Sequence, residues 1–269
     1  MTSNNMELIK KLRERSGAGM MDCKRALDES ENDLEKALEF LRKKGIAKAA
    51  KREGREAKEG CIQLSVNAEG TEGYIVEVNA ETDFVARNEK FQNFAKAILG
   101  LIICSQPADL NALLDLKLKT GTVKEDLDAL SGTIGEKLAI KNFNIIKGAS
   151  VAGYSHMGGR IGVLVALDKP GKQDLAVDIA MQVAAANPKY IDPSEVPAAE
   201  VEKEKEIERE VMAKENKPEA MMEKIMIGKI NKFYESVCLV KQEYIKDDKR
   251  KVEQILNGAK VTKFVRYSL

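Results

Sequence analysis

The chain has 269 residues, a length usual for two or three modules, and it can bury a hydrophobic core without disulfide or metal cross-links. Its 44 Lys and Arg residues nearly balance its 43 Asp and Glu residues, so no overall field attracts the whole chain to nucleic acid or to a membrane. No stretch approaches the roughly 18 apolar residues of a membrane span, and no signal peptide opens the chain. We therefore expect a cytoplasmic protein that binds no membrane.

Cysteine and histidine are too few and too scattered for the common metal and redox sites. No two cysteines form a C-x-x-C pair, and the chain has one histidine, His156. We expect no metal, no cofactor and no catalytic residue, so the protein is not expected to be an enzyme. The cysteines are predicted to be small buried side chains in a reducing cytosol: Cys23, Cys61, Cys104 and Cys238.

Residues 1–50 predict a module of three short helices. Gly17 is expected to end the first helix in a left-handed conformation, and residues 32–35 have the residue types of a capping box for the third. Apolar residues recur at helical spacing in three stretches: Met6, Ile9 and Leu12; Cys23, Ala26 and Leu27; Leu34, Ala37, Leu38 and Leu41.

The segment between the first two predicted helices carries two possible functional features. Gly17-Ala18-Gly19 resembles part of a dinucleotide-binding loop, but it follows a helix and not a strand, the third glycine is missing, and no Walker-type motif occurs. We therefore expect no direct nucleotide binding. Met20 and Met21 are adjacent and cannot both face one core, so one of them is expected to be exposed as an adaptable contact surface.

Residues 42–59 are strongly basic, with eight basic and three acidic side chains and few large apolar ones. This composition favours an exposed linker or a frayed helix containing a domain boundary, and we assign the linker to residues 51–59. No aromatic side chains interleave the charges, so we expect no specific nucleic-acid site.

The region after Gly60 predicts two α+β halves that share the order strand, strand, helix. The predicted elements are strands 61–66 and 74–78 with helix 88–103, then strands 151–155 and 161–166 with helix 173–186. The halves form a core of two subdomains with antiparallel sheets, the first over residues 60–140 and the second over residues 141–199 and 237–269. Helix 123–138 is expected to bridge them, and strand 260–267 is expected to return to the second sheet.

Residues 200–236 predict an antiparallel helical hairpin that protrudes from the body. Alternating charges surround thin apolar stripes, and Pro218 suits the first turn of the second helix. A hairpin of this coiled-coil type could join two copies of the chain, so a homodimer or a two-to-two complex stays open. The stripes are Val201, Ile207 and Val211 on one helix and Met222, Met226, Ile230 and Phe233 on the other.

The stretch Thr82-Asp83-Phe84-Val85 lies between a predicted strand and a predicted helix. Composition favours a buried Phe84, because Phe91 follows it by seven residues and a longer helix would place both on one face. Its neighbours favour the opposite, since Arg87 and Asn88 break that stripe. Thr82 and Asp83 resemble a helix start, which would place Phe84 in an exposed first turn.

His156 precedes Gly158 and Gly159 in the second predicted hairpin. The simplest interpretation is an exposed or hydrogen-bonded turn histidine, because no Cys or Ser stands at a catalytic spacing from it. A contact role stays open.

Three blocks of residues resemble the bacterial elongation factor Ts family, the guanine-nucleotide exchange factors of elongation factor Tu. They are LRERSGAGMMDCKRAL, VNAETDFVA and GGRIGVLVAL, and they occur in the family's order and at its spacing. The resemblance implies an N-terminal three-helix module like that of ubiquitin-associated (UBA) domains, a two-subdomain α+β core and a protruding helical hairpin. Some members carry a further C-terminal helical module, and its contacts are expected to be absent here.

The resemblance also implies which residues contact elongation factor Tu. Residues Thr82, Asp83, Phe84 and Val85 would enter the partner's GTPase domain beside its nucleotide and magnesium. The Phe84 side chain would act as a wedge that dislodges the ion. Further contacts are implied for Met20 and Met21 on the GTPase domain, and for Ile134, Gly135 and His156 on a distal domain.

Two other classes of function remain to be compared. An RNA- or ribosome-binding accessory protein would use the basic segment and the hairpin, and its binding would depend steeply on salt. An enzyme would need titratable groups with perturbed pKa values around His156.

Overall fold

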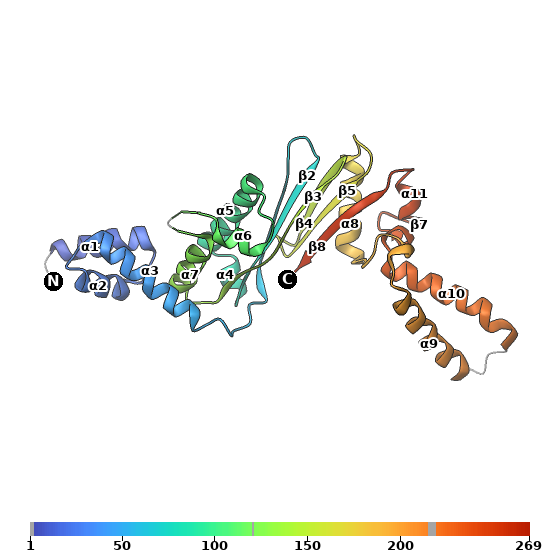
Figure 1. Cartoon of the computed structure of the whole chain (residues 1–269), viewed down its shortest axis with the longest axis horizontal. Coiled ribbons are helices and arrows are strands. Elements are labelled where there is room, and N and C mark those ends of the chain that lie inside the picture. The colour runs from blue at the N-terminus through green and yellow to red at the C-terminus, as the bar shows by residue number, and fades with distance from the viewer. Residues whose placement is uncertain (1–2, 120, 215–218) are drawn as a thin grey trace. The chain divides into compact units, whose positions relative to one another are not determined.

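The computed structural model describes residues 3–119, 121–214 and 219–269. It confirms an α+β fold with antiparallel sheets, N-terminal helices and a helical hairpin (Figure 1). The chain forms two compact units, one made of Met1–Gln63, Val76–Asn144 and Leu269, the other of Leu64–Ile75 and Ile145–Ser268. This division passes through the first β-hairpin, which the domain boundaries drawn from the sequence keep whole.

The first unit begins with helices α1 (Ser3–Ser16), α2 (Met20–Glu29) and α3 (Leu34–Ala50). Gly17 ends α1 as predicted, with φ +69° and its N–H bonded to the Arg13 carbonyl at 2.7 Å. The predicted capping box of α3 is wrong. Asp33 caps the helix alone, accepting from the Glu35 and Lys36 amides, because the residue that would complete the box is Lys36, which has no acceptor. The buried core is Ile9, Leu12, Cys23, Ala26, Leu27 and Ala37.

Helix α3 continues to Ala50, where the predicted linker begins, and it packs against α7 (Val123–Ile134) (Figure 1). Residues 42–50 are therefore an attached helix and not the exposed or frayed segment that their composition favours. The two backbones approach closely at Gly45 and Gly132, where a Cβ atom added to Gly132 would lie 2.4 Å from the Gly45 Cα. The Arg42 guanidinium also donates to the Glu125 carboxylate at 2.5 Å. Basic residues of this segment therefore attach one helix to another.

The first sheet has the strand order β1 (Glu59–Val66), β2 (Glu72–Ala80), β3 (Leu138–Lys147). Helices α4 (Asp83–Ala86), α5 (Glu89–Ser105) and α6 (Leu110–Asp115) lie between β2 and α7 in the chain. The predicted helix 123–138 does not bridge two halves. It ends at Ile134, because Gly135 adopts φ +95° as its C-cap, and β3 begins at Leu138.

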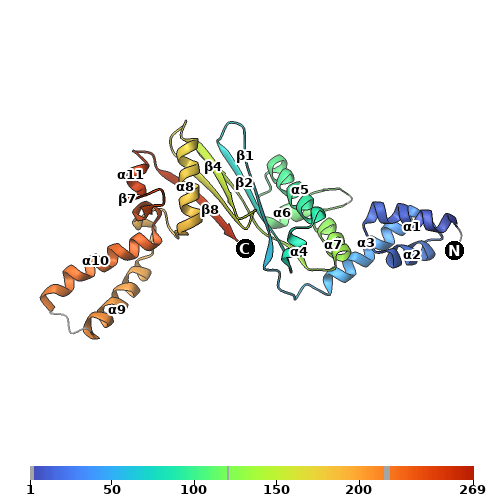
Figure 2. The same cartoon turned by 180° about the vertical axis from the view of Figure 1, so that it is seen from behind.

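The second unit contains the sheet β4 (Ser150–His156), β5 (Ile161–Leu167), β8 (Val261–Ser268). Strands β4 and β5 pair antiparallel from Ser150 opposite Leu167 to His156 opposite Ile161, and β8 pairs with β5, so the return of the last strand is confirmed. Helix α8 (Gln173–Ala186) packs on β4 and β5 with Ala176, Ile179, Ala180 and Val183 buried (Figure 2). The remaining elements are η1 (Pro193–Glu195), η2 (Leu239–Lys241), β6 (Glu243–Tyr244), β7 (Asp247–Lys251) and α11 (Val252–Ile255).

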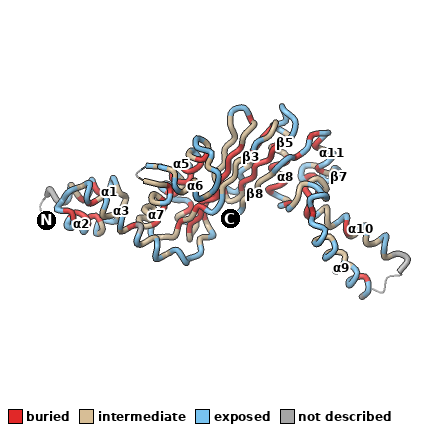
Figure 3. The backbone as a smooth tube through the Cα atoms, viewed as in Figure 1, coloured by how far each residue is buried: buried red, intermediate tan, exposed pale blue. Residues whose placement is uncertain are grey.

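Helices α9 (Ala198–Lys214) and α10 (Glu219–Val237) form the predicted hairpin, whose described residues are mostly half-buried or exposed (Figure 3). The predicted stripe of α9 is wrong in part. The inward residues are Glu208 and Met212, which follow Val201 by seven and eleven positions. Ile207 and Val211, which were predicted to belong to the stripe, are exposed. Glu208 is paired there with Lys229 of α10 at 3.0 Å. Pro218 lies outside the described residues.

Three of the four cysteines are buried as predicted: Cys23, Cys61 and Cys238. Cys104, in the last turn of α5, is exposed.

Among the helices that the structure describes, none combines the length and the apolar character needed to cross a bilayer.

The contact between α3 and α7 predicts the effect of one added methyl group. Gly132→Ala should lower the free energy of unfolding by about 1–3 kcal/mol, because the new Cβ overlaps the Gly45 backbone. Gly100→Ala is the matched control in α5, since a Cβ there meets nothing within 4 Å. The control should be neutral or stabilising by about 0.5–1 kcal/mol. Equal unfolding free energies for the two variants in urea titrations would contradict the close helix contact.

The hairpin is predicted to be dispensable for the fold of the rest of its unit. Its base must be kept, because Val201, Phe233 and Tyr234 pack against the buried cluster of Val196, Val237 and Cys238. Replacing residues 205–229 by a short Gly-Ser linker should leave a cooperative thermal transition. An aggregating product without such a transition would refute this prediction. A lower mass by light scattering would show that the hairpin joins copies of the chain.

Candidate functional site

The short helix α4 holds Phe84 in an exposed position. Thr82 caps the helix, its Oγ1 accepting from the Val85 amide at 3.4 Å. Ala86 is buried and lies two residues after Phe84, about 200° around the helix, so Phe84 points to the opposite side. The Phe84 residue is 83% exposed, which confirms the predicted exposed first turn and makes the buried alternative wrong.

The Glu136 carboxylate holds the start of α4. Its Oε2 accepts from the Thr82 amide at 3.0 Å, and its Oε1 accepts from the Thr82 hydroxyl at 2.7 Å. Glu136 follows Gly135, the C-cap of α7, so this pair of hydrogen bonds joins segments 54 residues apart in the chain.

A second carboxylate makes the reverse connection. Glu81 accepts from the Lys137 amide at 2.6 Å, and the Arg55 guanidinium lies 3.2 Å from the same oxygen. The Lys137 amide, followed by the Arg55 guanidinium, lowers the pKa of the Glu81 carboxyl. Residues 81–82 and 136–137 are therefore held together by one carboxylate from each segment, an arrangement that we call the carboxylate clamp.

The other residues of the predicted loop are less constrained. Asp83 forms an ion pair with Arg87 at 3.0 Å, but both side chains are well exposed, so the pair contributes little to stability. The Asp83 carboxylate is thus available at the surface beside Phe84. Val85 is half-buried.

Ile134 and Gly135 lie beside this loop in the fold. Gly135 is exposed and Ile134 is half-buried, and the next residue, Glu136, bonds directly to Thr82. Two stretches that were predicted separately are therefore brought together in one unit.

Met20 and Met21, in the first turn of α2, are 53% and 70% exposed. At least one was expected to be exposed, and the structure exposes both. Helical side chains lean towards the N-terminus, so a residue at the first position projects beyond the end of the bundle even when it is in line with Cys23 and Leu27.

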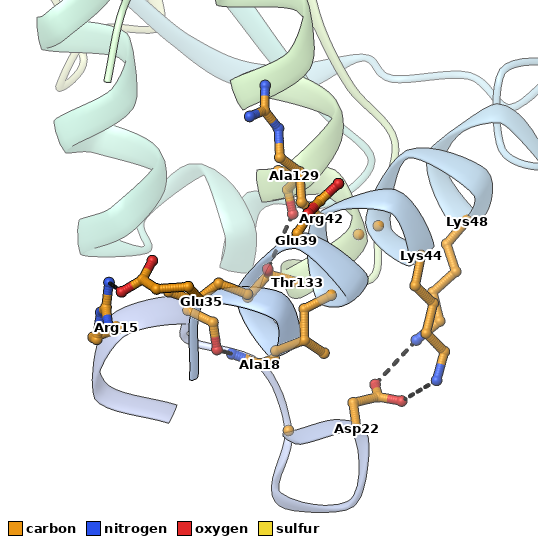
Figure 4. A pocket seen from close by; sticks show the side chains of 16 residues that line it. Arg15, Ala18, Asp22, Glu35, Glu39, Arg42, Lys44, Lys48, Ala129 and Thr133 are labelled. Carbon is orange, nitrogen blue, oxygen red and sulfur yellow. Dashed lines mark hydrogen bonds and ion pairs between the residues drawn. The ribbon is translucent and has the colours of Figure 1, made fainter. Parts of the chain in front are cut away.

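The start of α2 is attached to α3 through Asp22, whose oxygens lie 2.8 Å from Lys44 Nζ and 3.1 Å from Lys48 Nζ (Figure 4). The hydrogen bond from Lys44, followed by that from Lys48, lowers the pKa of the Asp22 carboxyl. These ion pairs fix the turn that carries the two methionines.

A cavity of about 420 Å³ lies between α2, α3 and α7. Its labelled side chains include Arg15, paired with Glu35 at 2.8 Å, and Asp22 with its two lysines (Figure 4). Ala129 and Thr133 of α7 line the opposite side. The paired charges leave the cavity without a recognisable ligand-binding chemistry.

His156 lies in the second unit, at the end of β4. Its Nδ1 is 3.0 Å from the Tyr154 hydroxyl, and the two rings stack with centroids 5.8 Å apart. The following residue, Met157, is exposed and has φ +51°. This is the hydrogen-bonded turn histidine of the simplest interpretation. In the described part of the chain, no three His, Cys, Asp or Glu side chains group so as to hold a metal ion.

Sequence reasoning missed the residues of the clamp: Arg55, Glu81, Glu136 and Lys137. Glu81 directly precedes Thr82, and Glu136 directly follows Gly135, so adjacency to the predicted stretches was an available signal. No local pattern could show that these two stretches meet.

Comparison with known proteins gives consistent matches to one family. The family model described as "Elongation factor TS" matches residues 81–269. A curated protein named "Elongation factor Ts", from Prosthecochloris aestuarii, is 44% identical over 278 aligned residues, which cover 97% of this chain and 96% of the relative. The matched region includes α4, Ile134, Gly135 and His156.

The exposure of Phe84 predicts a clear contrast between two phenylalanines. Phe84→Ala should leave the melting temperature nearly unchanged, because the side chain contacts little of the protein. Phe91→Ala, in α5, should cost roughly 3–5 kcal/mol, because Phe91 is fully buried. Thermal and urea unfolding monitored by circular dichroism would test both variants. A large loss of stability for Phe84→Ala would mean that the loop is part of the core.

Proposed function

Because this chain belongs to the elongation factor Ts family, we propose that it binds elongation factor Tu carrying GDP, displaces Mg²⁺ and promotes exchange of GDP for GTP during protein synthesis. The observation that carries this proposal is Phe84, 83% exposed on a four-residue helix that is held at its N-cap, Thr82. A single exposed apolar side chain is common on protein surfaces. One displayed from a fixed support is suited to insertion into a partner.

The proposed mechanism is mechanical. Residues Thr82, Asp83, Phe84 and Val85 enter the partner's GTPase domain, and Phe84 wedges between side chains that support its magnesium and phosphate loop. Asp83 acts near the displaced elements. Loss of the cation removes the main counter-charge on the diphosphate, so GDP dissociates faster. The chain contributes the volume of the Phe84 side chain and the position in which the loop holds it. No covalent step is required.

Exchange is catalytic because the two ligands of the partner oppose each other. If the factor weakens GDP binding, GDP must weaken factor binding by the same factor, since the coupling free energy is reciprocal. An incoming nucleotide therefore releases the factor.

The remaining surfaces are proposed to supply affinity. Met20 and Met21 would contact the GTPase domain, where flexible thioether side chains adapt to an irregular surface. Ile134, Gly135 and His156 would contact a distal domain of the partner. These contacts explain why loss of Phe84 should leave much of the affinity intact.

The RNA-binding alternative loses support from the structure of the basic segment. Arg42 bonds to Glu125, and Lys44 and Lys48 bond to Asp22. Arg52 donates to the Ser131 carbonyl, and Arg55 bonds to Glu81. Cations that are already paired offer less charge for phosphate contacts, which dominate nucleic-acid affinity.

The proposal predicts faster GDP release in the presence of the chain. Stopped-flow fluorescence would follow a labelled GDP leaving purified elongation factor Tu, with and without this protein. Phe84→Ala should slow the stimulated release by roughly tenfold or more, equivalent to about 1.4 kcal/mol of activation free energy. Its affinity for nucleotide-free partner should fall much less.

Ile245→Ala is the matched control, because Ile245 is an exposed apolar residue with no proposed contact. It should release GDP at the rate of the parent chain. No acceleration by the parent chain would refute the proposed function. Parent-like release by Phe84→Ala would refute only the role of the wedge.

A further inference from the structure

We propose that Glu136 is a positioning residue, whose carboxylate sets the direction in which α4 presents Phe84. This inference rests on the proposed exchange function and extends it to a residue outside the loop. Glu136 acts through Thr82, and its side chain is not required to touch the partner.

The need for an external support follows from the size of α4. The helix has four residues, Asp83–Ala86, and an isolated helix of this length is unstable, because nucleation fixes several residues for a single hydrogen bond. The cap from Thr82 Oγ1 to the Val85 amide is 3.4 Å long and is a weak restraint. The direction of α4 must therefore be set by tertiary contacts.

Glu136 supplies the contact at the required point. Both of its carboxylate oxygens bond to Thr82, one to the amide and one to the hydroxyl, at 3.0 and 2.7 Å. Two bonds from one planar group to one residue restrict rotation as well as position, and hydrogen bonds to a charged acceptor are stronger than neutral ones. Thr82 lies where β2 ends and α4 begins, so a restraint there is transmitted directly to Phe84 two residues later.

The far end of α4 has its own, separate support. Gln92 Nε2 donates to the Ala86 carbonyl at 2.5 Å, and Gln63 Nε2 donates to Gln92 Oε1 at 3.0 Å. With its last residue held and its N-cap, Thr82, released, α4 would pivot about Ala86. The displaced end is the one that carries Phe84.

The surrounding contacts indicate that the fold survives removal of the Glu136 side chain. Glu81 still bonds to the Lys137 amide and to Arg55. The Ser131 hydroxyl donates to the Glu136 backbone carbonyl at 2.6 Å, a contact that a side-chain substitution leaves in place. The Glu136 side chain can therefore be removed without removing these neighbouring contacts.

The experiment compares Glu136→Ala with Glu136→Gln. The amide of glutamine can accept from the Thr82 N–H and donate to the Thr82 hydroxyl oxygen, so it can keep both contacts without the charge. Glu206→Ala, at an exposed position of α9, is the control that removes the same charge elsewhere. Three quantities are measured for each variant: melting temperature, amide hydrogen exchange over residues 82–86 in the free protein, and GDP release over a range of factor concentrations.

We expect Glu136→Ala to keep a cooperative transition, to exchange the amides of residues 82–86 faster, and to lower the maximal GDP-release rate by about tenfold to a hundredfold. The concentration for half-maximal stimulation should change little, because the other contact surfaces are intact. Glu136→Gln should recover most of both properties, and Glu206→Ala should match the parent.

Several results would overturn the inference. One is a parent-like maximal rate for Glu136→Ala. Another is a reduced rate with unchanged amide exchange, which would indicate direct contact with the partner. A third is a reduction that only follows the unfolded fraction. If the parent chain does not accelerate GDP release, the proposed function fails. The amide hydrogen-exchange measurement needs no partner, so it then decides whether Glu136 holds the loop. Unchanged amide exchange in Glu136→Ala would overturn that role too.

Discussion

The close backbone approach between α3 and α7, at Gly45 and Gly132, is the constraint on which the proposed contact surfaces of the first unit depend. Because neither residue has a side chain, α3 lies directly against α7, and the N-terminal bundle continues into α3 without a break. Helix α7 then ends at Gly135, and the next residue holds the start of α4 through Thr82. One continuous series of helix packing and side-chain contacts therefore connects the turn that carries Met20 and Met21 with the helix that carries Phe84.

Under the proposed function, this arrangement explains how Phe84 could act on another protein without a chemical step. An exposed side chain can displace groups of a partner only if its own loop does not move away on contact. The rigidity of the loop therefore matters as much as the shape of the side chain. The support here consists of polar contacts to backbone groups at both ends of α4, at Thr82 and Ala86. Such contacts keep their geometry without covering Phe84, whereas apolar packing around the loop would bury the side chain that must stay free.

Much of the fold could be predicted because local patterns carry it. Helix α8 was predicted with its observed bounds from apolar residues at helical spacing, and the start of α4 from the capping preference of Thr82. Strand β3 was missed because its burial does not alternate, with two exposed residues in succession at Lys141 and Asn142. The attachment of residues 42–50 was missed because basic residues of this segment find their acids far away in the sequence, as Arg42 does with Glu125. The carboxylate clamp was missed for the same reason, since composition and periodicity contain no information about which distant segments meet.

The four cysteines have a consequence for following the protein in solution. Cys104 is exposed, whereas Cys23 lies in the N-terminal bundle, Cys61 in the first sheet, and Cys238 at the base of the helical hairpin, all buried. Burial raises the pKa of the three covered thiols, that of Cys238 to about 11, so they react slowly while the fold is intact. A thiol reagent thus modifies Cys104 first and can place a single fluorophore there. The slower modification rates of the three buried thiols then report the local opening of three different parts of the molecule.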